Sequence, residues 1–496
     1  MSRFFVSAIA KSSGKTTISI GLAAAFSARG LKVQTFKKGP DYIDPMWLSR
    51  ASGRASYNLD FNTQSPTEIL ATYGHGYSDA DLALIEGNKG LHDGVDPKGS
   101  DCSAALAKLL RAPVVLIVDT IGMARGIAPL LVGYQSFDPE VEIAGVILNK
   151  VGVARQESKL RQAIENYTDL RVLGAIGRDG GLNVNERHLG LTTPSEAEQA
   201  DSVIVRARDA VLQGVDLDAV LATASRQEPA KTPLLRGISP PDVTIALARD
   251  AAFGFYYSDD LEALQNAGAK LTLFDAMSDR DLPQCDGLFI GGGFPETLAA
   301  ALAANESLRT DIRAKIEAGL PSYAECGGLM YLSRSITYQG VRHDMVGVIP
   351  ADAVMGEKPQ GRGLVRVEET ADALWPNAPW SNAPWQSPPF AEATPAHEFH
   401  YARLENIAPD LRYAYRMKRG FGVDGHNDGI VIANLLASFT HLRDSSRCRW
   451  AERFVAFVRA QKAQRQNSAF RARAPAEMVG ADSSSGGPSS RLRSTG

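Results

Sequence analysis

The chain has 496 residues, 44% of them hydrophobic, which is enough to form at least two domains with their own buried cores. Its formal net charge of −3 reflects nearly balanced acidic and basic residues, which argues against binding to nucleic acid or to an anionic membrane. No apolar run reaches the roughly 20 residues of a membrane span, and the N-terminus lacks a secretory signal, so we expect a cytoplasmic protein with small-molecule partners.

From residue 3 to about residue 222, short β-rich runs alternate with helical stretches. The predicted strands are 4–8, 33–37, 82–86, 114–119, 143–149 and 172–176. Strands that are apolar throughout are typical of sheets buried on both faces, and with helices between them they predict a parallel, doubly wound α/β domain. Ligands of such sheets bind at the carboxyl ends of the strands.

The first predicted strand leads through Gly14 into a helical pattern. This order is typical of a phosphate-binding loop, in which the glycine lets backbone N–H groups face an anion. We assign Gly14, Lys15, Thr16 and Thr17 to nucleotide binding, with Lys15 reaching the outer phosphates and the Thr16 hydroxyl ligating Mg²⁺. The usual pattern has a glycine five residues before Gly14, where this chain has Ile9. An ordinary strand–turn–helix connection is the alternative.

Charged residues follow two further strands. Lys37, Lys38, Asp41 and Asp44 follow the second strand, and Glu86 and Asp93 follow the run 82–85. Because Mg²⁺ takes oxygen ligands and shares them with phosphates, we expect Asp41 and Glu86 to hold it beside Thr16. Lys37 or Lys38 is expected to neutralise a phosphoryl group in transit, and Asp44 and Asp93 are assigned to the same substrate side. The alternative is that these charges only solvate loop tips.

Four segments together carry a family resemblance: Lys38-Gly39-Pro40-Asp41-Tyr42-Ile43-Asp44-Pro45, Asn58-Leu59-Asp60, Glu86-Gly87 with Gly90-Leu91 and Asp93-Gly94, and Glu186-Arg187-His188-Leu189-Gly190-Leu191. They resemble the cobyrinic acid a,c-diamide synthase family, which belongs to the dethiobiotin-synthetase-like P-loop proteins. The resemblance implies that ATP phosphorylates a substrate carboxylate. It also implies that Asn149 reads the adenine edge.

Prolines and polar residues between 221 and 243 predict an interdomain linker. A second doubly wound α/β unit begins with a strand at 243–250, continues with a helix through Leu261 and Leu264, and returns to a strand at 287–290. That strand ends in three glycines, 291–293, whose exposed N–H groups suit an oxyanion hole, which we assign to Gly292 and Gly293. The predicted divisions are 1–222 for the ATP-binding unit, 223–242 for the linker, 243–460 for the second unit and 461–496 for a disordered tail.

The chain has four cysteines, widely spaced and without a CxxC pair, so neither a disulfide framework nor a zinc site is expected. Cys326 is followed by Gly327 and Gly328 where a strand-to-helix turn is predicted, which is typical of an exposed nucleophile. A buried structural cysteine is the alternative. The arrangement resembles class I glutamine amidotransferase domains, in which a cysteine attacks the side-chain amide of glutamine and releases ammonia.

A cysteine nucleophile needs a base, and the candidates in this unit are His397, His400, His426 and His441. By the resemblance we prefer His441 and place His397 in a wall of the domain. Many class I domains carry a glutamate two residues past this histidine, but here Arg443 occupies that position. A carboxylate from elsewhere, or only a backbone carbonyl, is then needed to fix the tautomer.

Together the two units predict an ATP- and glutamine-dependent ligase that uses Mg²⁺ and forms an amide through an acyl phosphate. By resemblance the substrate is a modified tetrapyrrole with acetate side chains, cobyrinate or hydrogenobyrinate, with sirohaem or nickel-sirohydrochlorin as runners-up. From another class, a partitioning-type ATPase switch with a sensor domain is the alternative. The sequence leaves a homodimer open, and the Trp- and Pro-rich run 375–390 is predicted to be a long loop without a catalytic role.

Overall fold

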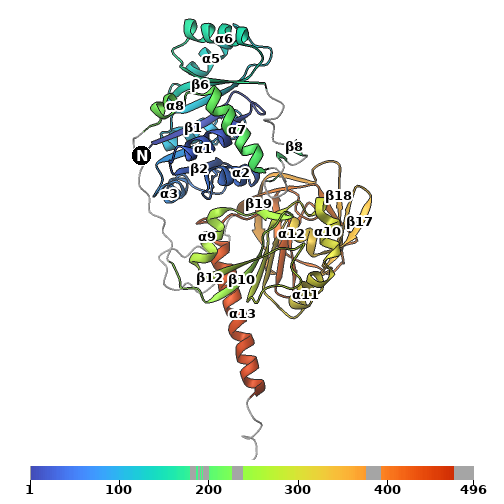
Figure 1. Ribbon diagram of the computed structural model, residues 1–496. Coiled ribbons are helices and arrows are strands. Elements are labelled where there is room, and N and C mark those ends of the chain that lie inside the picture. Colours follow the sequence, from blue (N-terminus) through green and yellow to red (C-terminus); the bar gives the residue numbers. More distant parts are fainter. Residues whose placement is uncertain are drawn as a thin grey trace, which may run out of the picture.

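The chain folds around two separate sheets, which form the upper and lower lobes in Figure 1. The computed structural model describes residues 2–178, 200–225, 238–375 and 393–473, together with 186, 187, 190, 191 and 193. The first sheet ends at residue 177 and the second begins at residue 243. This separation supports the division at 222 and 243, which we keep as a proposal.

The first sheet has seven parallel strands in the order β3-β2-β4-β1-β5-β6-β7. Its strands are β1 Ser2–Ala8, β2 Val33–Lys38, β3 Tyr57–Leu59, β4 Leu82–Glu86, β5 Val114–Asp119, β6 Ile143–Val151 and β7 Val172–Gly177. Its helices are α1 Lys15–Ala28, α2 Ile43–Ser52, α3 Pro66–Gly76, α4 Ser103–Leu110, α5 Ile127–Phe137, α6 Ala154–Tyr167, α7 Ala200–Gly214 and α8 Leu217–Thr223. All six predicted strands are confirmed within two residues, and only the short β3 is additional.

The pleat of β1 shows why this sheet is doubly wound. Phe4 and Val6 belong to a core packed under α1, α2 and α7, whereas Phe5 belongs to a core packed under α3 to α6. Successive side chains of a strand point to opposite faces, so an all-apolar strand needs helices on both sides. The carboxyl ends of β1, β2 and β4 therefore meet at one edge of the sheet, where Glu86 is level with Val6 and Lys37.

The second sheet has nine strands in the order β12-β10-β13-β15-β24-β23-β22-β19-β20. Five are parallel: β10 Val243–Ala248, β12 Ala269–Phe274, β13 Gly287–Ile290, β15 Ser322–Glu325 and β24 Leu435–Ser438. Four continue the sheet antiparallel: β19 Gly361–Glu369, β20 Thr394–His400, β22 Arg412–Arg419 and β23 Asn427–Ile432. The predicted parallel α/β core is confirmed. The antiparallel extension was not predicted, although the apolar run 430–433 indicates a strand in the sequence.

Smaller elements complete the second lobe. β11 Phe253–Phe255 pairs with β14 Gly292–Gly293, and a four-stranded sheet contains β16 Ser333–Tyr338, β17 Val341–Asp344, β18 Ile349–Met355 and β21 Ala402–Glu405. The helices are α9 Ser258–Asn266, the 3₁₀ turn η2 Pro295–Leu298, α10 Ala299–Ala304, α11 Glu306–Glu317, α12 Gly327–Leu332 and α13 Trp450–Arg473. β8 Glu186–Arg187 and β9 Gly190–Leu191 form a separate pair.

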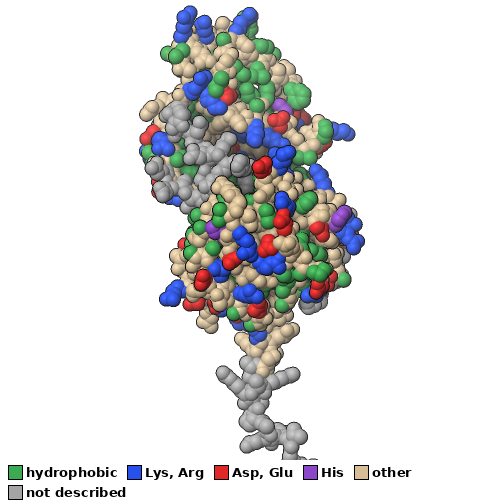
Figure 2. Space-filling model, turned by 90° about the vertical axis from the view of Figure 1, so that its right-hand side faces the viewer, with side chains coloured by type: hydrophobic (Ala, Val, Ile, Leu, Met, Phe, Trp, Pro, Cys, Tyr) green, Lys and Arg blue, Asp and Glu red, His purple; other side chains and the backbone are tan. Residues whose placement is uncertain are grey.

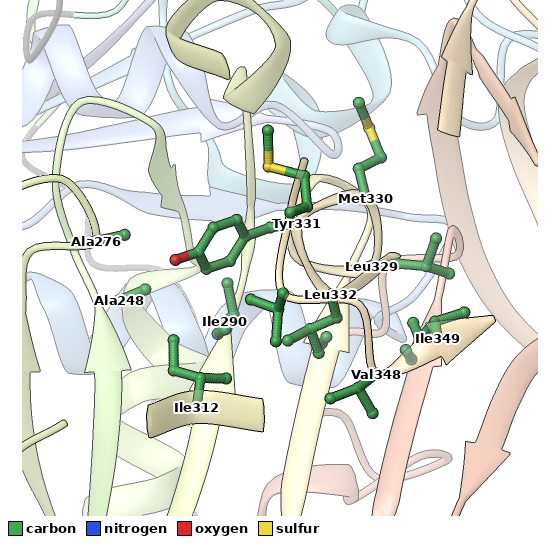
Figure 3. Packing of buried hydrophobic residues seen from close by; sticks show 14 of the residues in the cluster. Ala248, Ala276, Ile290, Ile312, Leu329, Met330, Tyr331, Leu332, Val348 and Ile349 are labelled. Atoms are coloured by element: carbon green, nitrogen blue, oxygen red, sulfur yellow. The ribbon is translucent and has the colours of Figure 1, made fainter. Parts of the chain in front are cut away.

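The short helix α12 is anchored in a dense apolar core (Figure 3). Leu329 and Leu332 are fully buried on it, and Ile290 and Ile349 pack around them. A Cβ added to Gly328 would lie 2.2 Å from the backbone oxygen of Ile290, so only glycine allows the helix to approach β13 this closely. This packing fixes the turn that precedes α12, where Cys326 lies.

Several sequence predictions fall near the ends of the described ranges. The tail was predicted from residue 461, but α13 continues to Arg473, so its first residues are helical and that boundary was set too early. Most of the predicted linker, most of the run 375–390, and His188 and Leu189 of the family motif lie outside the described residues.

None of the helices in the described ranges is both long and apolar enough to cross a membrane. The face seen in Figure 2 carries basic and acidic side chains interspersed among the described residues.

Candidate active sites

The phosphate-binding loop joins β1 to α1 at the carboxyl edge of the first sheet. Gly14 precedes the helix with a φ of 90°, a left-handed conformation that favours glycine. A Cβ at this position would lie 2.2 Å from the amide nitrogen of Asn149, which donates a hydrogen bond to the carbonyl oxygen of Ser13 at 2.9 Å. Asn149 therefore braces the loop from β6, in addition to any role in reading adenine.

A cluster of oppositely charged side chains surrounds Thr16. The Thr16 hydroxyl donates its one proton to Oε1 of Glu86 at 2.7 Å, and Oδ2 of Asp44 lies 3.1 Å away as an alternative acceptor. The ammonium of Lys37 donates to both carboxylates, at 2.9 Å to Glu86 and at 2.5 Å to Asp44. The ends of β2 and β4 and the starts of α1 and α2 thus converge on one point, and the structure brings together Thr16, Lys37 and Glu86 as the sequence predicted.

Burial and the neighbouring charges shift the pKa values of this cluster in opposite directions. Glu86 is fully buried, and desolvation raises its pKa even though Lys37 opposes the shift. Burial would lower the pKa of Lys37, but Asp44 and Glu86 outweigh it and hold this pKa above its ordinary value. Burial and the nearby Lys37 lower the pKa of Lys15 to about 8. A bound polyphosphate would stabilise the charged form of a buried lysine that lies beside another cation.

The residues present fit a magnesium ion shared with phosphates. Glu86 Oε2 is buried and has no hydrogen-bond partner within the described part of the chain, so one carboxylate oxygen remains free to ligate. Among the described residues, no group of three or more His, Cys, Asp or Glu forms a complete metal cage. Mg²⁺ commonly takes only one or two protein carboxylates and completes its shell with phosphates and water. Thr16, Glu86 and Asp44 match that pattern.

The structure places the carboxylate of Asp44, rather than that of Asp41, beside Thr16. Asp41 accepts the backbone N–H of Asp44 at 2.9 Å at the start of α2, and burial raises its pKa to about 7. Asp44, in the first turn of that helix, is the residue whose carboxylate contacts Thr16. The sequence contains two acidic residues three positions apart, and the position at which α2 begins decides which one faces the loop.

The remaining predicted residues lie around the same edge. Asp93 accepts the N–H of Gly90 at 3.0 Å, in a turn whose Leu91 donates to the Ala8 carbonyl at 2.8 Å. This turn therefore lies against the phosphate loop. Lys38 follows Lys37 on the strand, so it faces the opposite side, toward Asp60 and Asp101, and burial lowers its pKa. The structure does not bring Lys38 into the Thr16 cluster.

In the second lobe, Cys326 lies at the turn between β15 and α12. Its φ of 47° and ψ of −100° form a strained conformation of the kind found at exposed nucleophiles on strand-to-helix turns. The turn is fixed by the Cys326 N–H, which donates to the Ser438 carbonyl at 2.7 Å. The predicted strand–cysteine–helix arrangement is present, but the side chain is not exposed as predicted, because Cys326 is 6% exposed.

His441 lies beside Cys326 and faces a carboxylate that the sequence analysis did not identify. Nδ1 of His441 is 3.4 Å from Oε2 of Glu325, an ion-pair distance rather than a well-aligned hydrogen bond. Burial would lower the pKa of His441, but Cys326 and Glu325 raise it to about 10. Glu325 is held by the Tyr323 hydroxyl at 2.5 Å and the Leu442 N–H at 3.0 Å. We propose Glu325 as the orienting carboxylate.

The signal that could have identified Glu325 is its position. It ends an otherwise uncharged, buried strand and directly precedes the candidate nucleophile. Arg443, which occupies the position of the usual glutamate, is buried and ties the lobes together instead. Its guanidinium donates to the Asn58 carbonyl at 2.8 Å and to Asp259 at 2.5 Å, and it lies 4.4 Å from the ring centroid of Tyr257.

The glycines assigned to the oxyanion hole lie next to the nucleophile turn. A Cβ on Gly327 would be 3.1 Å from the backbone nitrogen of Gly293, and a Cβ on Gly292 would be 2.6 Å from Cε1 of His441. We keep the oxyanion hole as a proposal, with the Gly293 N–H as its donor. His397 packs directly on His441, with ring centroids 4.9 Å apart, so the part of the domain wall that it forms lies against the candidate base. Burial lowers the pKa of His397 well below its ordinary value.

A phosphate loop in one α/β lobe and a Cys–His pair with a carboxylate in another define a glutamine-hydrolysing, ATP-using ligase. Residues 5–190 match the model of the CobQ/CobB/MinD/ParA nucleotide binding domain, and residues 244–447 match that of the CobB/CobQ-like glutamine amidotransferase domain. The chain belongs to the cobyrinate a,c-diamide synthase family.

Three relatives illustrate the similarity, and each is named cobyrinate a,c-diamide synthase. The protein of Magnetococcus marinus is 42% identical, over 92% of this chain and 97% of its own length. Those of Methanosarcina acetivorans and Archaeoglobus fulgidus are both 38% identical, over 89% of this chain and 92% and 94% of their lengths.

Proposed function

We propose that this protein uses ATP and glutamine to convert acetate carboxylates of cobyrinate into amides. The observation that carries the proposal is the joining, in one chain, of the Thr16 cluster with the Cys326–His441–Glu325 group. A carboxylate is a poor electrophile, so amide formation needs both an activating phosphoryl group and a source of ammonia. The names of the relatives supply the substrate and favour cobyrinate over sirohaem and nickel-sirohydrochlorin; hydrogenobyrinate remains a second candidate.

In the glutaminase half, the sulfur of Cys326 attacks the side-chain amide carbon of glutamine. His441 holds the proton of the Cys326 thiol, so that the thiolate attacks, and then gives this proton to the departing ammonia, while the Gly293 N–H stabilises the oxyanion. The resulting thioester is hydrolysed by water to glutamate and free Cys326. Glu325 holds the His441 ring and stabilises its protonated form.

In the synthetase half, an oxygen of the substrate carboxylate attacks the γ-phosphorus of ATP, and ADP leaves. Lys15 and Lys37 offset the charge that accumulates on the transferring phosphoryl group. Bound Mg²⁺, held by Thr16, Glu86 and Asp44, would neutralise phosphate charge. Ammonia then attacks the acyl carbon, inorganic phosphate leaves, and the product is an amide.

The partitioning-type switch is disfavoured by the strained Cys326 turn and its buried histidine–glutamate pair, because a nucleotide switch has no use for a glutaminase. The test is incubation with ATP, Mg²⁺, glutamine and each of the four candidate tetrapyrroles, followed by mass spectrometry. Each amidation exchanges an OH for an NH₂ and gives a product of distinct mass. Amidated cobyrinate or hydrogenobyrinate is expected; conversion of only sirohaem or nickel-sirohydrochlorin, or of none, would overturn the proposal.

A further inference from the structure

A tyrosine of the first lobe is inserted among the catalytic residues of the second. Tyr42 lies between β2 and α2 and is 92% buried, with an exposed fraction of 8%. Its ring is parallel to that of Phe255, at 1° and a centroid distance of 5.3 Å. The rings of Tyr257, His441 and His397 lie 4.5, 5.2 and 5.5 Å from it.

These contacts connect Tyr42 to the proposed base and to the strand pair that contains the oxyanion glycines. His441 is the proposed base, and Phe255 on β11 is paired with Gly292 on β14, the strand that carries the oxyanion glycines. Gly292 itself is closely enclosed by the His441 and Phe255 rings, which a Cβ would meet at 2.6 and 3.3 Å. The Tyr42 ring therefore packs both against the His441 imidazole and against Phe255, whose strand β11 pairs with the strand β14 of the oxyanion glycines.

The same short segment reaches the phosphate site. Asp44, two residues after Tyr42, contacts Thr16 and Lys37, while Asp41, one residue before Tyr42, accepts the Asp44 N–H. The amide of Asn58 donates to the carbonyls of Gly39 and Asp41 at 2.9 and 2.7 Å, which pins the start of the segment. A displacement of Asp44 is thus passed to Tyr42 rather than absorbed by a loose loop.

We propose that Tyr42 is a positioning residue that makes glutamine hydrolysis depend on occupancy of the phosphate site. The proposal rests on the proposed function, because it needs both half-reactions. When nucleotide and substrate fill the phosphate site, Asp44 shifts, and Tyr42 sets the His441 ring and the Gly292 strand for attack by Cys326. Ammonia is then released faster when an acyl phosphate is being formed.

The experiment compares Tyr42→Leu and Tyr42→Met, which keep the space apolar, with Tyr42→Phe, which keeps the ring. Tyr57→Leu is the matched control, because Tyr57 also bridges the lobes, through Glu262 at 2.5 Å. Its ring contacts are with Phe36 and His75, not with His441. Glutamate release is measured with and without ATP plus cobyrinate, and amide formation is measured with glutamine and with ammonium chloride.

In the wild type, ATP plus cobyrinate should stimulate glutamate release by about 5–150-fold, the usual range of coupling between sites. Tyr42→Leu and Tyr42→Met should bring this ratio close to one through kcat rather than KM for glutamine, and release more glutamate than amide. Tyr42→Phe should restore the ratio, and Tyr57→Leu should leave it unchanged. Ammonia-dependent amidation should persist in all four variants and shows that they are folded.

Wild-type stimulation in Tyr42→Leu or Tyr42→Met would overturn the coupling role, as would a parallel loss of ammonia-dependent amidation in both variants. Equal loss of stimulation in Tyr57→Leu would show that any damage to the interface suffices, which also contradicts the proposal. If the wild type amidates no tetrapyrrole, the proposed function fails instead.

Discussion

Replacing Glu325 by glutamine should impair glutamine hydrolysis while leaving the synthetase half intact. The carboxylate lies 3.4 Å from His441, where an effective dielectric constant of about 20 gives an attraction of about 5 kcal/mol between the two charges. Glutamine keeps the shape and can still accept the Leu442 N–H, and its amide dipole retains part of the attraction. We therefore expect a loss of roughly 2–3 kcal/mol, about 30–150-fold in kcat for glutamate release.

Glu325→Gln should also change the pH dependence of glutamate release in a defined direction. The pKa of His441 is raised to about 10 by Cys326 and Glu325 against the effect of burial, so the protonated imidazole is present below that pH and is lost above it. Without the Glu325 charge this pKa falls, and the alkaline limb of the glutaminase profile should move to lower pH. The matched control is Glu317→Gln. Glu317 is an exposed glutamate on α11 that pairs only with Arg313 in the described structure, so its replacement should change neither kcat for glutamate release nor the position of the alkaline limb. Glutamate release within twofold of wild type, with an unmoved alkaline limb, would refute the orienting role of Glu325.

Three further outcomes follow from the two sites. Cys326→Ala and His441→Ala should abolish glutamine-dependent amidation but retain amidation with ammonium chloride at high pH; failure of ammonia to rescue them would show that the sites are not separable. Lys15→Ala and Thr16→Ala should lower amidation from either nitrogen source by on the order of 10²-fold or more, measured at saturating ATP, and near wild-type turnover would remove the phosphate-loop assignment. Because the pKa of Lys15 is lowered to about 8 in the free protein and a bound polyphosphate raises it, ATP affinity by calorimetry should fall by up to about tenfold per pH unit above 8. Lys15→Arg, which stays charged, should bind ATP without that decline.

The first lobe was largely predictable because its strands are buried on both faces. Continuous apolar runs mark such strands, and the carboxyl-end rule then places Lys37 and Glu86 next to Thr16 without any knowledge of distances. The nucleophile was predictable for a similar reason, since Cys326 follows a strand and precedes two glycines. The antiparallel strands β19, β20 and β22 were missed because polar and apolar residues are mixed along them.

The residues whose roles could not be predicted from the sequence are those whose positions are set by tertiary structure. The choice between Asp41 and Asp44 depends on where α2 begins. Glu325 faces His441 only because β15 pairs with β24, which places Glu325 level with Ser438. Tyr42 meets His441 only through the docking of the two lobes, and no local pattern in the sequence records that contact.

The most direct test of the central claim is to follow the side-chain amide nitrogen of glutamine, labelled with nitrogen-15, into cobyrinate. The account predicts labelled amide in the product only when ATP and Mg²⁺ are present, and no label from glutamine in Cys326→Ala. In Lys15→Ala, amide from any nitrogen source should fall by on the order of 10²-fold or more. Labelled product without ATP, or label that appears only as free ammonia while cobyrinate stays unchanged, would contradict it.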